Sequence, residues 1–210
     1  MAPDIILLVA VAAVVIRMAV LHGRLRALGA QVIRDPRTGA FNRRHMQVTL
    51  AAAVERRRRS GEPASLLLID IDRFKEVNDL LGHAEGDPVL KELVVLVGQR
   101  QRKQDALFRT GGEEFALLLS RARLAEALGV ADSLRGLVQD AGLTPGRRLS
   151  ISIGVVELGH GQAVPEWIAE ADAALCRAKR AGRNRVAGRS SAPPPRLVEA
   201  DNRLSFSARS

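Results

Sequence analysis

The chain has 210 residues and a mass of 22.7 kDa, which leaves room for one domain of ordinary size and excludes two large ones. Hydrophobic residues make up 47% and charged residues 26%, so we expect a packed core rather than a disordered chain. Aromatic residues make up only 3%, which argues against a protein that stacks single-stranded nucleic acid on its rings. The single cysteine, Cys176, excludes an internal disulfide and a cysteine-clustered metal site.

The net charge of +9 comes from the two ends of the chain. Residues 17–59 hold eleven arginines and two acidic residues, and residues 179–210 hold eight basic and two acidic residues. Residues 60–178 hold 13 basic and 18 acidic residues, so the middle of the chain is acidic. This distribution favours a membrane surface or a nucleotide as partner, and we expect no nucleic-acid partner.

The N-terminal part of the chain is strongly apolar. An unbroken apolar run covers residues 5–16 and resumes at residues 18–21. As a helix, residues 5–21 would extend about 25 Å, the lower limit for crossing a bilayer. The arginines that follow would keep that side in the cytoplasm, and a secretory signal peptide would carry basic residues before the apolar run. We therefore expect residues 1–33 to be a single-pass inner-membrane anchor with a short linker; the alternative is a cytoplasmic protein.

Residues 34–187 alternate between helical and strand-like patterns. A helix is expected over residues 42–59, and the continuous apolar run of residues 64–71 is typical of a buried strand. Asp72 can cap a helix that starts at Arg73 and ends at Gly82, and a second helix opens at Gly86 or Asp87 with Pro88 in its first turn.

The pattern continues with a hairpin over residues 106–119. Its paired glycines, Gly111 and Gly112, predict a two-residue turn with positive φ. Beyond it, the expected elements are a helix at 124–140, a strand at 149–156, a helix at 165–179 and a short strand at 185–187. The fold class is therefore α/β or α+β, a central sheet with flanking helices. The proline- and serine-rich residues 188–210 read as a disordered tail.

Two acidic patterns could meet in this fold. Asp70 and Asp72 end the first long strand, where period-two geometry puts their carboxylates on one side, and Glu113 and Glu114 directly follow the glycines. If the hairpin pairs beside that strand, Asp70 and Glu113 become neighbours that call for a hard divalent cation such as Mg²⁺. Glycines let a phosphate approach the backbone amides, so the combination indicates phosphoryl or nucleotidyl transfer, although each pattern alone is common in surface turns.

Several motifs resemble one family. Arg109–Phe115, RTGGEEF, resembles the signature of GGDEF-domain diguanylate cyclases. Further similarity, in the same order, covers residues 34–187: DPRTG at 35–39, NRR at 42–44, DIDRFK at 70–75, ND at 78–79, SIG at 152–154 and GRNR at 182–185. The resemblance implies a homodimer that condenses two GTP molecules into cyclic di-GMP and two pyrophosphates, in bacterial second-messenger signalling. Each 3′-hydroxyl would attack the α-phosphate of the opposing nucleotide.

The resemblance also implies roles for individual residues. Glu113 would be the proton acceptor, and Mg²⁺, or Mn²⁺ in its place, would be held by Asp70, the carbonyl of Ile71, Glu113 and, for a second ion, Glu114. Guanine would be bound by Asn78 and Asp87, and the phosphates would meet the backbone of Gly111 and Gly112 and the side chains of Lys75, Lys179 and Arg183.

Arg102 and Asp105 resemble the family's product-inhibition site, where cyclic di-GMP binds as inhibitor; taken alone, this pattern is an ordinary i,i+3 ion pair. Three positions depart from the family pattern. The motif that begins at Asp35 usually has leucines where Arg37 and Ala40 stand in this chain, and Leu81 replaces an aromatic residue. No metal, base or phosphate position departs from the family pattern, so we expect an active enzyme. The alternative is a non-catalytic cyclic di-GMP receptor that uses the Arg102 and Asp105 site.

Overall fold

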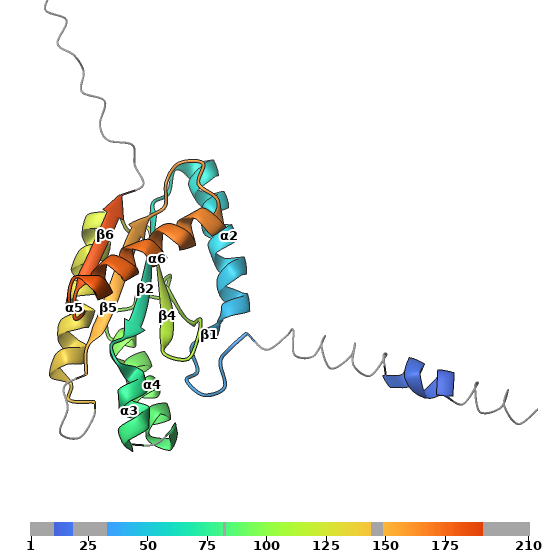
Figure 1. The fold of residues 1–210 in the computed structure, drawn as a ribbon. Coiled ribbons are helices and arrows are strands. Elements are labelled where there is room, and N and C mark those ends of the chain that lie inside the picture. Colours follow the sequence, from blue (N-terminus) through green and yellow to red (C-terminus); the bar gives the residue numbers. More distant parts are fainter. Residues whose placement is uncertain (1–10, 19–32, 82, 144–148, 191–210) are drawn as a thin grey trace, which may run out of the picture.

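The computed structural model describes residues 11–18, 33–81, 83–143 and 149–190 (Figure 1). A six-stranded sheet has the order β1-β3-β4-β2-β5-β6. Its strands are β1 (Phe41–Asn42), β2 (Ala64–Ile71), β3 (Ala106–Arg109), β4 (Glu114–Ser120), β5 (Ile151–Glu157) and β6 (Val186–Ser190). The helices are α2 (Arg43–Ser60), α3 (Phe74–Leu81), α4 (His83–Gly98), α5 (Leu124–Asp140) and α6 (Val164–Arg180).

The central strand β2 pairs antiparallel with both β4 and β5, whereas β1 and β6 join the two edges in parallel. The sheet is covered on both faces. Leu66 of β2 packs in the hydrophobic cluster formed with α2 and α6, and Leu67 packs in the cluster formed with α4 and α5. This alternation follows from the two-residue period of a strand, and it decides on which face each acidic side chain lies.

Much of the predicted fold is confirmed. The mixed sheet with flanking helices is present, and β2 and α5 have the predicted bounds. Helix α2 begins after Asn42, whose Oδ1 accepts a hydrogen bond from the backbone N–H of His45 at 2.9 Å. The short strand β1 was not predicted, and β6 continues to Ser190, beyond the predicted strand end at residue 187.

Two predicted helix starts were wrong. Helix α3 begins at Phe74, because Arg73 has a φ of 56° and cannot be its first residue. Helix α4 begins at His83, so Gly86, Asp87 and Pro88 lie within the helix instead of opening it. The earlier start places Gly86 and Asp87 on a regular helical surface.

The predicted glycine turn was also wrong. Strand β3 ends at Arg109 and β4 begins at Glu114, so four residues connect them, and neither Gly111 nor Gly112 has a positive φ. The Arg109 guanidinium donates to the carbonyls of both glycines, at 3.1 Å and 2.8 Å. Side-chain hydrogen bonds therefore shape this loop, and a tight left-handed turn is not needed.

Of the predicted N-terminal anchor, residues 11–18 form a helix whose apolar side chains are exposed, and the remainder of residues 5–21 lies outside the described residues. In the part of the chain that the structure describes, no helix has the length and apolar character needed to cross a bilayer. Residues 191–210 of the predicted tail also lie outside the described ranges.

Candidate active site

The acidic residues meet where β2 ends beside the glycine loop. The strand register pairs Asp70 with Glu114, so these two side chains share the sheet face covered by α2 and α6. Glu113 lies one residue away, on the other side, and its carbonyl accepts the N–H of Ile71 at 3.4 Å. The expected approach of the hairpin to Asp70 is thus present, but the directly opposed partner of Asp70 is Glu114.

Asp70 is a buried carboxylate with a cation beside it. Its Oδ2 lies 2.7 Å from Nζ of Lys179, which comes from the last turn of α6. Burial raises the pKa of Asp70 above its usual value, Lys179 opposes that rise, and the charges of Glu113 and Glu114 add to it. The negative charges of Glu113 and Glu114 beside Asp70 are the part of this environment that favours a cation.

The oxygen donors at this position have the chemical character that Mg²⁺ prefers. Among the described residues, no set of three or more acidic, histidine or cysteine side chains is arranged as a ready-made metal site. Mg²⁺ is commonly held by one or two carboxylates together with water and substrate phosphates. Asp70, Glu113 and the carbonyl of Ile71 are oxygen donors of that kind, so their chemistry suits the ion.

Asp72 has a different use from Asp70. Its carboxylate accepts hydrogen bonds from the hydroxyls of Ser150 and Ser152, at 2.7 Å and 2.6 Å, and from the backbone N–H of Asn184 at 2.9 Å. It therefore ties the end of β2 to the start of β5 and to the segment that follows α6. Asp72 therefore has a structural role. The sequence did not predict this role, because the hydrogen-bond partners of Asp72 lie far away along the chain.

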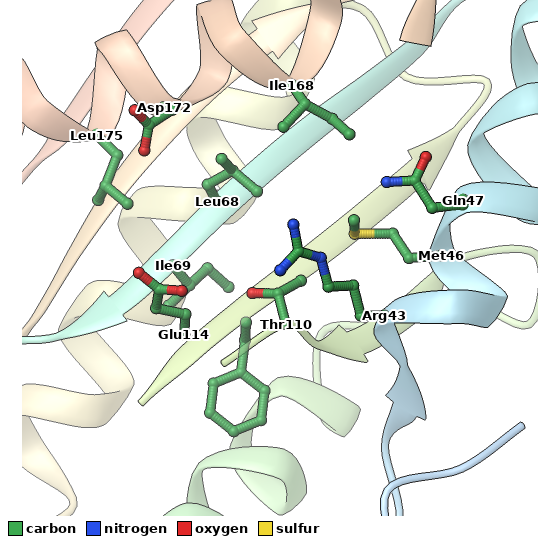
Figure 2. Close-up of a pocket in the computed structure, with 11 residues that line it drawn as sticks. Arg43, Met46, Gln47, Leu68, Ile69, Thr110, Glu114, Ile168, Asp172 and Leu175 are labelled. Carbon is green, nitrogen blue, oxygen red and sulfur yellow. The ribbon is translucent and has the colours of Figure 1, made fainter. Parts of the chain in front are cut away.

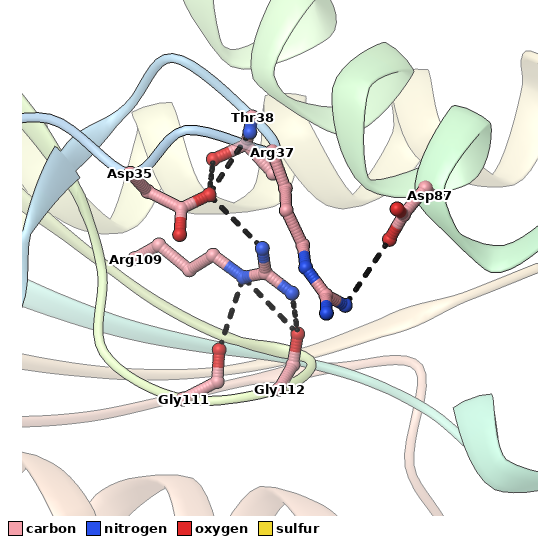
Figure 3. Close-up of polar contacts among 7 residues, drawn as sticks. All are labelled: Asp35, Arg37, Thr38, Asp87, Arg109, Gly111 and Gly112. Carbon is pink, nitrogen blue, oxygen red and sulfur yellow. Dashed lines mark hydrogen bonds and ion pairs between the residues drawn. The ribbon is translucent and has the colours of Figure 1, made fainter. Parts of the chain in front are cut away.

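The glycine loop is attached to the segment before β1 by a buried arginine (Figure 3). Arg109 Nη1 lies 2.9 Å from Asp35 Oδ1, while its other nitrogens hold the carbonyls of Gly111 and Gly112. Burial alone would raise the pKa of Asp35, but hydrogen bonds from Thr38 and Arg109 lower it below its usual value. Asp35 and Arg109 both belong to motifs found in the sequence, but nothing in the sequence indicated that their side chains form an ion pair.

One cavity, of about 350 Å³, gathers the residues predicted to bind guanine. Asn78 of α3 and Asp87 of α4 line it together with Gly112 and Glu113 of the glycine loop. Gly86 explains how two helices can present these groups: a Cβ at this position would collide with Oδ1 of Asn78. The predicted base-binding residues and the predicted proton acceptor therefore share one space.

A second cavity, of about 210 Å³, lies between α2 and α6 on the opposite face of the sheet (Figure 2). Glu114 and Thr110 line it from the loop side, with Arg43 of α2 and Asp172 of α6. A Cβ on Gly111 would lie 2.6 Å from Oε2 of Glu114, whereas Gly112 has open space around it. Glu114 begins β4 and Glu113 is the last residue of the loop before it, and the two neighbouring glutamates line different cavities.

The other predicted site residues are more scattered. Lys75 is exposed in the first turn of α3. Arg183, which has a φ of 61°, lines a further cavity of about 360 Å³ that also contains Asp72. Arg102 and Asp105 lie at the far end of β4, about 20 Å from the glycine loop by strand length. Asp105 is buried and accepts the backbone N–H groups of Arg102 and Ser120, at 2.8 Å and 3.1 Å.

Comparisons with known proteins show the family of this chain. Residues 32–185 match the family described as diguanylate cyclase, GGDEF domain. The diguanylate cyclase DgcM of Escherichia coli is 41% identical over 152 residues, which are 72% of this chain and 37% of that protein. The chain therefore spans a little over a third of the length of this curated relative.

Solved structures show the same fold. The coiled coil and GGDEF domain of DgcB from Caulobacter crescentus, in complex with c-di-GMP, has a TM-score of 0.73 at 26% identity, with 87% of this chain and 99% of that chain covered. The diguanylate cyclase SiaD of Pseudomonas aeruginosa, in complex with its activator SiaC, has a TM-score of 0.72 at 36% identity, with 89% and 73% covered. The chain belongs to the GGDEF domain family of diguanylate cyclases.

Proposed function

We propose that this protein is an active diguanylate cyclase that condenses two GTP molecules into cyclic di-GMP and two pyrophosphates. The observation that carries the proposal is the single cavity in which Asn78 and Asp87 face the same space as Glu113 and the glycine loop. A nucleotide whose base is held by the first pair would have its phosphates directed toward the second. Such positioning accounts for much of the rate of a nucleotidyl transfer.

Binding of the base rests on complementary hydrogen bonds. The carboxylate of Asp87 accepts from the N–H groups of guanine, and the amide of Asn78 both donates and accepts. The open space around Gly112 lets a phosphate approach the backbone of the loop. Lys179 and Arg183, with Lys75 on α3, supply positive charge for phosphate oxygens.

The chemical step is an in-line displacement at the α-phosphorus. The 3′-oxygen of one GTP forms a bond to the α-phosphorus of the other, and the bond to the leaving pyrophosphate breaks. Glu113 accepts the proton of the attacking hydroxyl. Asp70, the Ile71 carbonyl and Glu113 would hold Mg²⁺, with Glu114 available to a second ion and Mn²⁺ as a substitute. A bound ion supplies activation of the hydroxyl and neutralisation of the leaving group.

The reaction needs two opposed nucleotides, so we propose that the working form is a homodimer. Product inhibition is proposed at Arg102 and Asp105, where the exposed Arg102 side chain is available to the acceptors of guanine or phosphate. Asp105 is already bonded inside its turn, so we assign it chiefly the role of positioning Arg102. Arg102→Ala should then relieve inhibition by cyclic di-GMP without lowering the initial rate.

Attachment to the inner membrane is proposed for residues 5–21. The unbroken apolar run and the arginines that follow it support this proposal, as do the exposed apolar side chains of residues 11–18. Fractionation of cells that express the full chain tests it. Recovery of the protein in the membrane pellet after a high-salt wash is expected, and recovery in the supernatant would leave the cytoplasmic alternative.

The decisive experiment incubates the purified full chain with GTP and magnesium and measures cyclic di-GMP and pyrophosphate by chromatography. The wild type is expected to form cyclic di-GMP and pyrophosphate in a molar ratio of one to two. Glu113→Gln is expected to form neither product, with an unchanged circular dichroism spectrum. A protein confirmed as a dimer that forms no cyclic dinucleotide, yet binds added cyclic di-GMP, would instead be the non-catalytic receptor.

A further inference from the structure

The cavity that Asn78 and Asp87 line also has the cationic side chain of Arg37 in its lining. The side chain of Arg37 points toward Asp87 (Figure 3), and its Nη1 lies 3.6 Å from Oδ1 of Asp87. Both residues line the same cavity as Asn78. Arg37 stands where the family's first motif usually has a leucine. The substrate site of this chain therefore includes a guanidinium group that the resemblance does not supply.

The turn that carries Arg37 is held in place. Asp35 Oδ1 accepts hydrogen bonds from the N–H and hydroxyl of Thr38, at 2.9 Å and 2.7 Å, and from Arg109. The backbone N–H of Gly39 donates to the carbonyl of Asp35 at 2.9 Å. The backbone of Arg37 is thus attached to the glycine loop, while its side chain extends into the cavity from a fixed base.

A bound nucleotide can displace the contact between Arg37 and Asp87. The two side chains are 66% and 40% exposed, and they are joined by an ion pair at 3.6 Å. Ion pairs of this exposure contribute little to stability because water screens them. Both groups are therefore available to a ligand at little cost.

The two groups have opposite hydrogen-bonding character, as do the two parts of a guanine base. The N1 and N2 groups of guanine are donors that suit the carboxylate of Asp87, and O6 and N7 are acceptors that suit an arginine fork. Adenine presents an amino group in place of O6, which a guanidinium group cannot accept from. An arginine and an aspartate that line one cavity therefore distinguish guanine from adenine at both parts of the base.

We propose that Arg37 is a specificity-determining residue of the substrate site, which donates to O6 and N7 of the guanine that Asp87 and Asn78 hold. The proposal rests on the proposed function, since it assumes that this cavity takes the base of GTP. It assigns to Arg37 a favourable contact with substrate, beyond its ion pair with Asp87. A guanine nucleotide that lacks the N7 acceptor must then bind less tightly to this protein.

Calorimetry on the full chain with magnesium tests this contact. The ligands are 3′-deoxy-GTP and 3′-deoxy-7-deaza-GTP, which differ only at N7 and lack the attacking hydroxyl, so no turnover occurs. The variants are Arg37→Leu and Arg37→Met, which both remove every donor from this side chain. The control is Arg58→Leu, which removes an arginine from a similarly exposed ion pair with Glu55, away from the cavity.

The wild type and Arg58→Leu should bind the 7-deaza ligand roughly 5-fold less tightly, the lower end of the range for an arginine contact with guanine. Both Arg37 variants should bind the two ligands equally, with a weakened affinity for 3′-deoxy-GTP. An unchanged ratio in these variants, or tighter binding by both, would overturn the role of Arg37 and leave the proposed function intact. A wild type that binds neither ligand and forms no cyclic dinucleotide would overturn both proposals.

Discussion

Arg109 and Asp35 are 74 residues apart in the sequence, and their side chains lie 2.9 Å apart in the structure. The Arg109 side chain is only 9% exposed, so this ion pair lies largely out of water. Because the same guanidinium group holds the carbonyls of Gly111 and Gly112, the pair fixes the glycine loop relative to the segment before β1. The position of Glu113, which follows directly, depends on that attachment.

Removing this guanidinium group should impair turnover more than folding. Arg109→Met removes the ion pair with Asp35, which keeps its two hydrogen bonds from Thr38, and leaves the carbonyls of Gly111 and Gly112 without this donor. We expect the free energy of unfolding to fall by roughly 1.5–3 kcal/mol. A displaced loop should lower the rate of cyclic di-GMP formation at saturating GTP by on the order of 10- to 100-fold. Arg58→Met serves as the control, and a wild-type rate in Arg109→Met would disprove the role of the pair.

The contribution of Asp35 to stability should depend on pH. Its pKa in the folded protein lies below the ordinary value of 3.8, so its ionised form stabilises the fold above that pH. This stabilisation is lost as the pH falls through the folded-state pKa. The difference in unfolding free energy between the wild type and Asp35→Asn should therefore be constant from pH 7 to about pH 5 and shrink below pH 4. A difference that grows on acidification would contradict the assigned direction. The pKa of Asp70 shifts the other way, but Asp70 is present in both proteins, so its contribution cancels in the difference.

Gly86 should matter more for binding of GTP than for stability. A Cβ at this position would collide with Oδ1 of Asn78 and lie close to the Phe74 ring, so Gly86→Ala must displace the amide from the cavity that Asn78 and Asp87 line. We expect KM for GTP to rise by roughly 5-fold, the equivalent of one hydrogen bond, with a smaller change in kcat. Gly98→Ala, at the end of the same helix with open space around it, is the matched control. Equal KM values for the two variants would show that Asn78 does not bind the base.

Gly154 should matter for stability. It lies in β5, where a Cβ would collide with the backbone of Ala171 and Leu175 in α6. Because neither backbone can move without shifting the whole helix, Gly154→Ala should cost about 3 kcal/mol or slightly more of unfolding free energy. Gly129→Ala, at an open position within α5, should instead stabilise the protein by about 0.5–1 kcal/mol in the same denaturant titration. Similar midpoints for the two variants would show that α6 does not pack as closely as the structure has it.

Local patterns were sufficient for two elements. The strand at residues 64–71 and the helix at 124–140 have the predicted bounds, because a continuous apolar run of strand length and the helical spacing of apolar residues are both properties of one segment. The order of the motifs was likewise sufficient to identify the family. Asn78 and Asp87, which the motifs assigned to one ligand, line one cavity in the structure. Helix starts were less predictable, since the φ of Arg73 and the helical state of Gly86 depend on neighbours outside the segment.

The amino-acid order alone thus established a mixed sheet-and-helix domain, the family and the residue types available for chemistry, since these depend on short-range spacing. Tertiary pairing decided how those residues are used. The strand register pairs Asp70 with Glu114, and Glu113 lines a different cavity from Glu114. The carboxylate of Asp72 accepts hydrogen bonds from two serines and a backbone amide. Tertiary pairing also joined Arg37 to Asp87. Strand register and contacts between distant segments come from packing of the whole core, and no local pattern of residues specifies them.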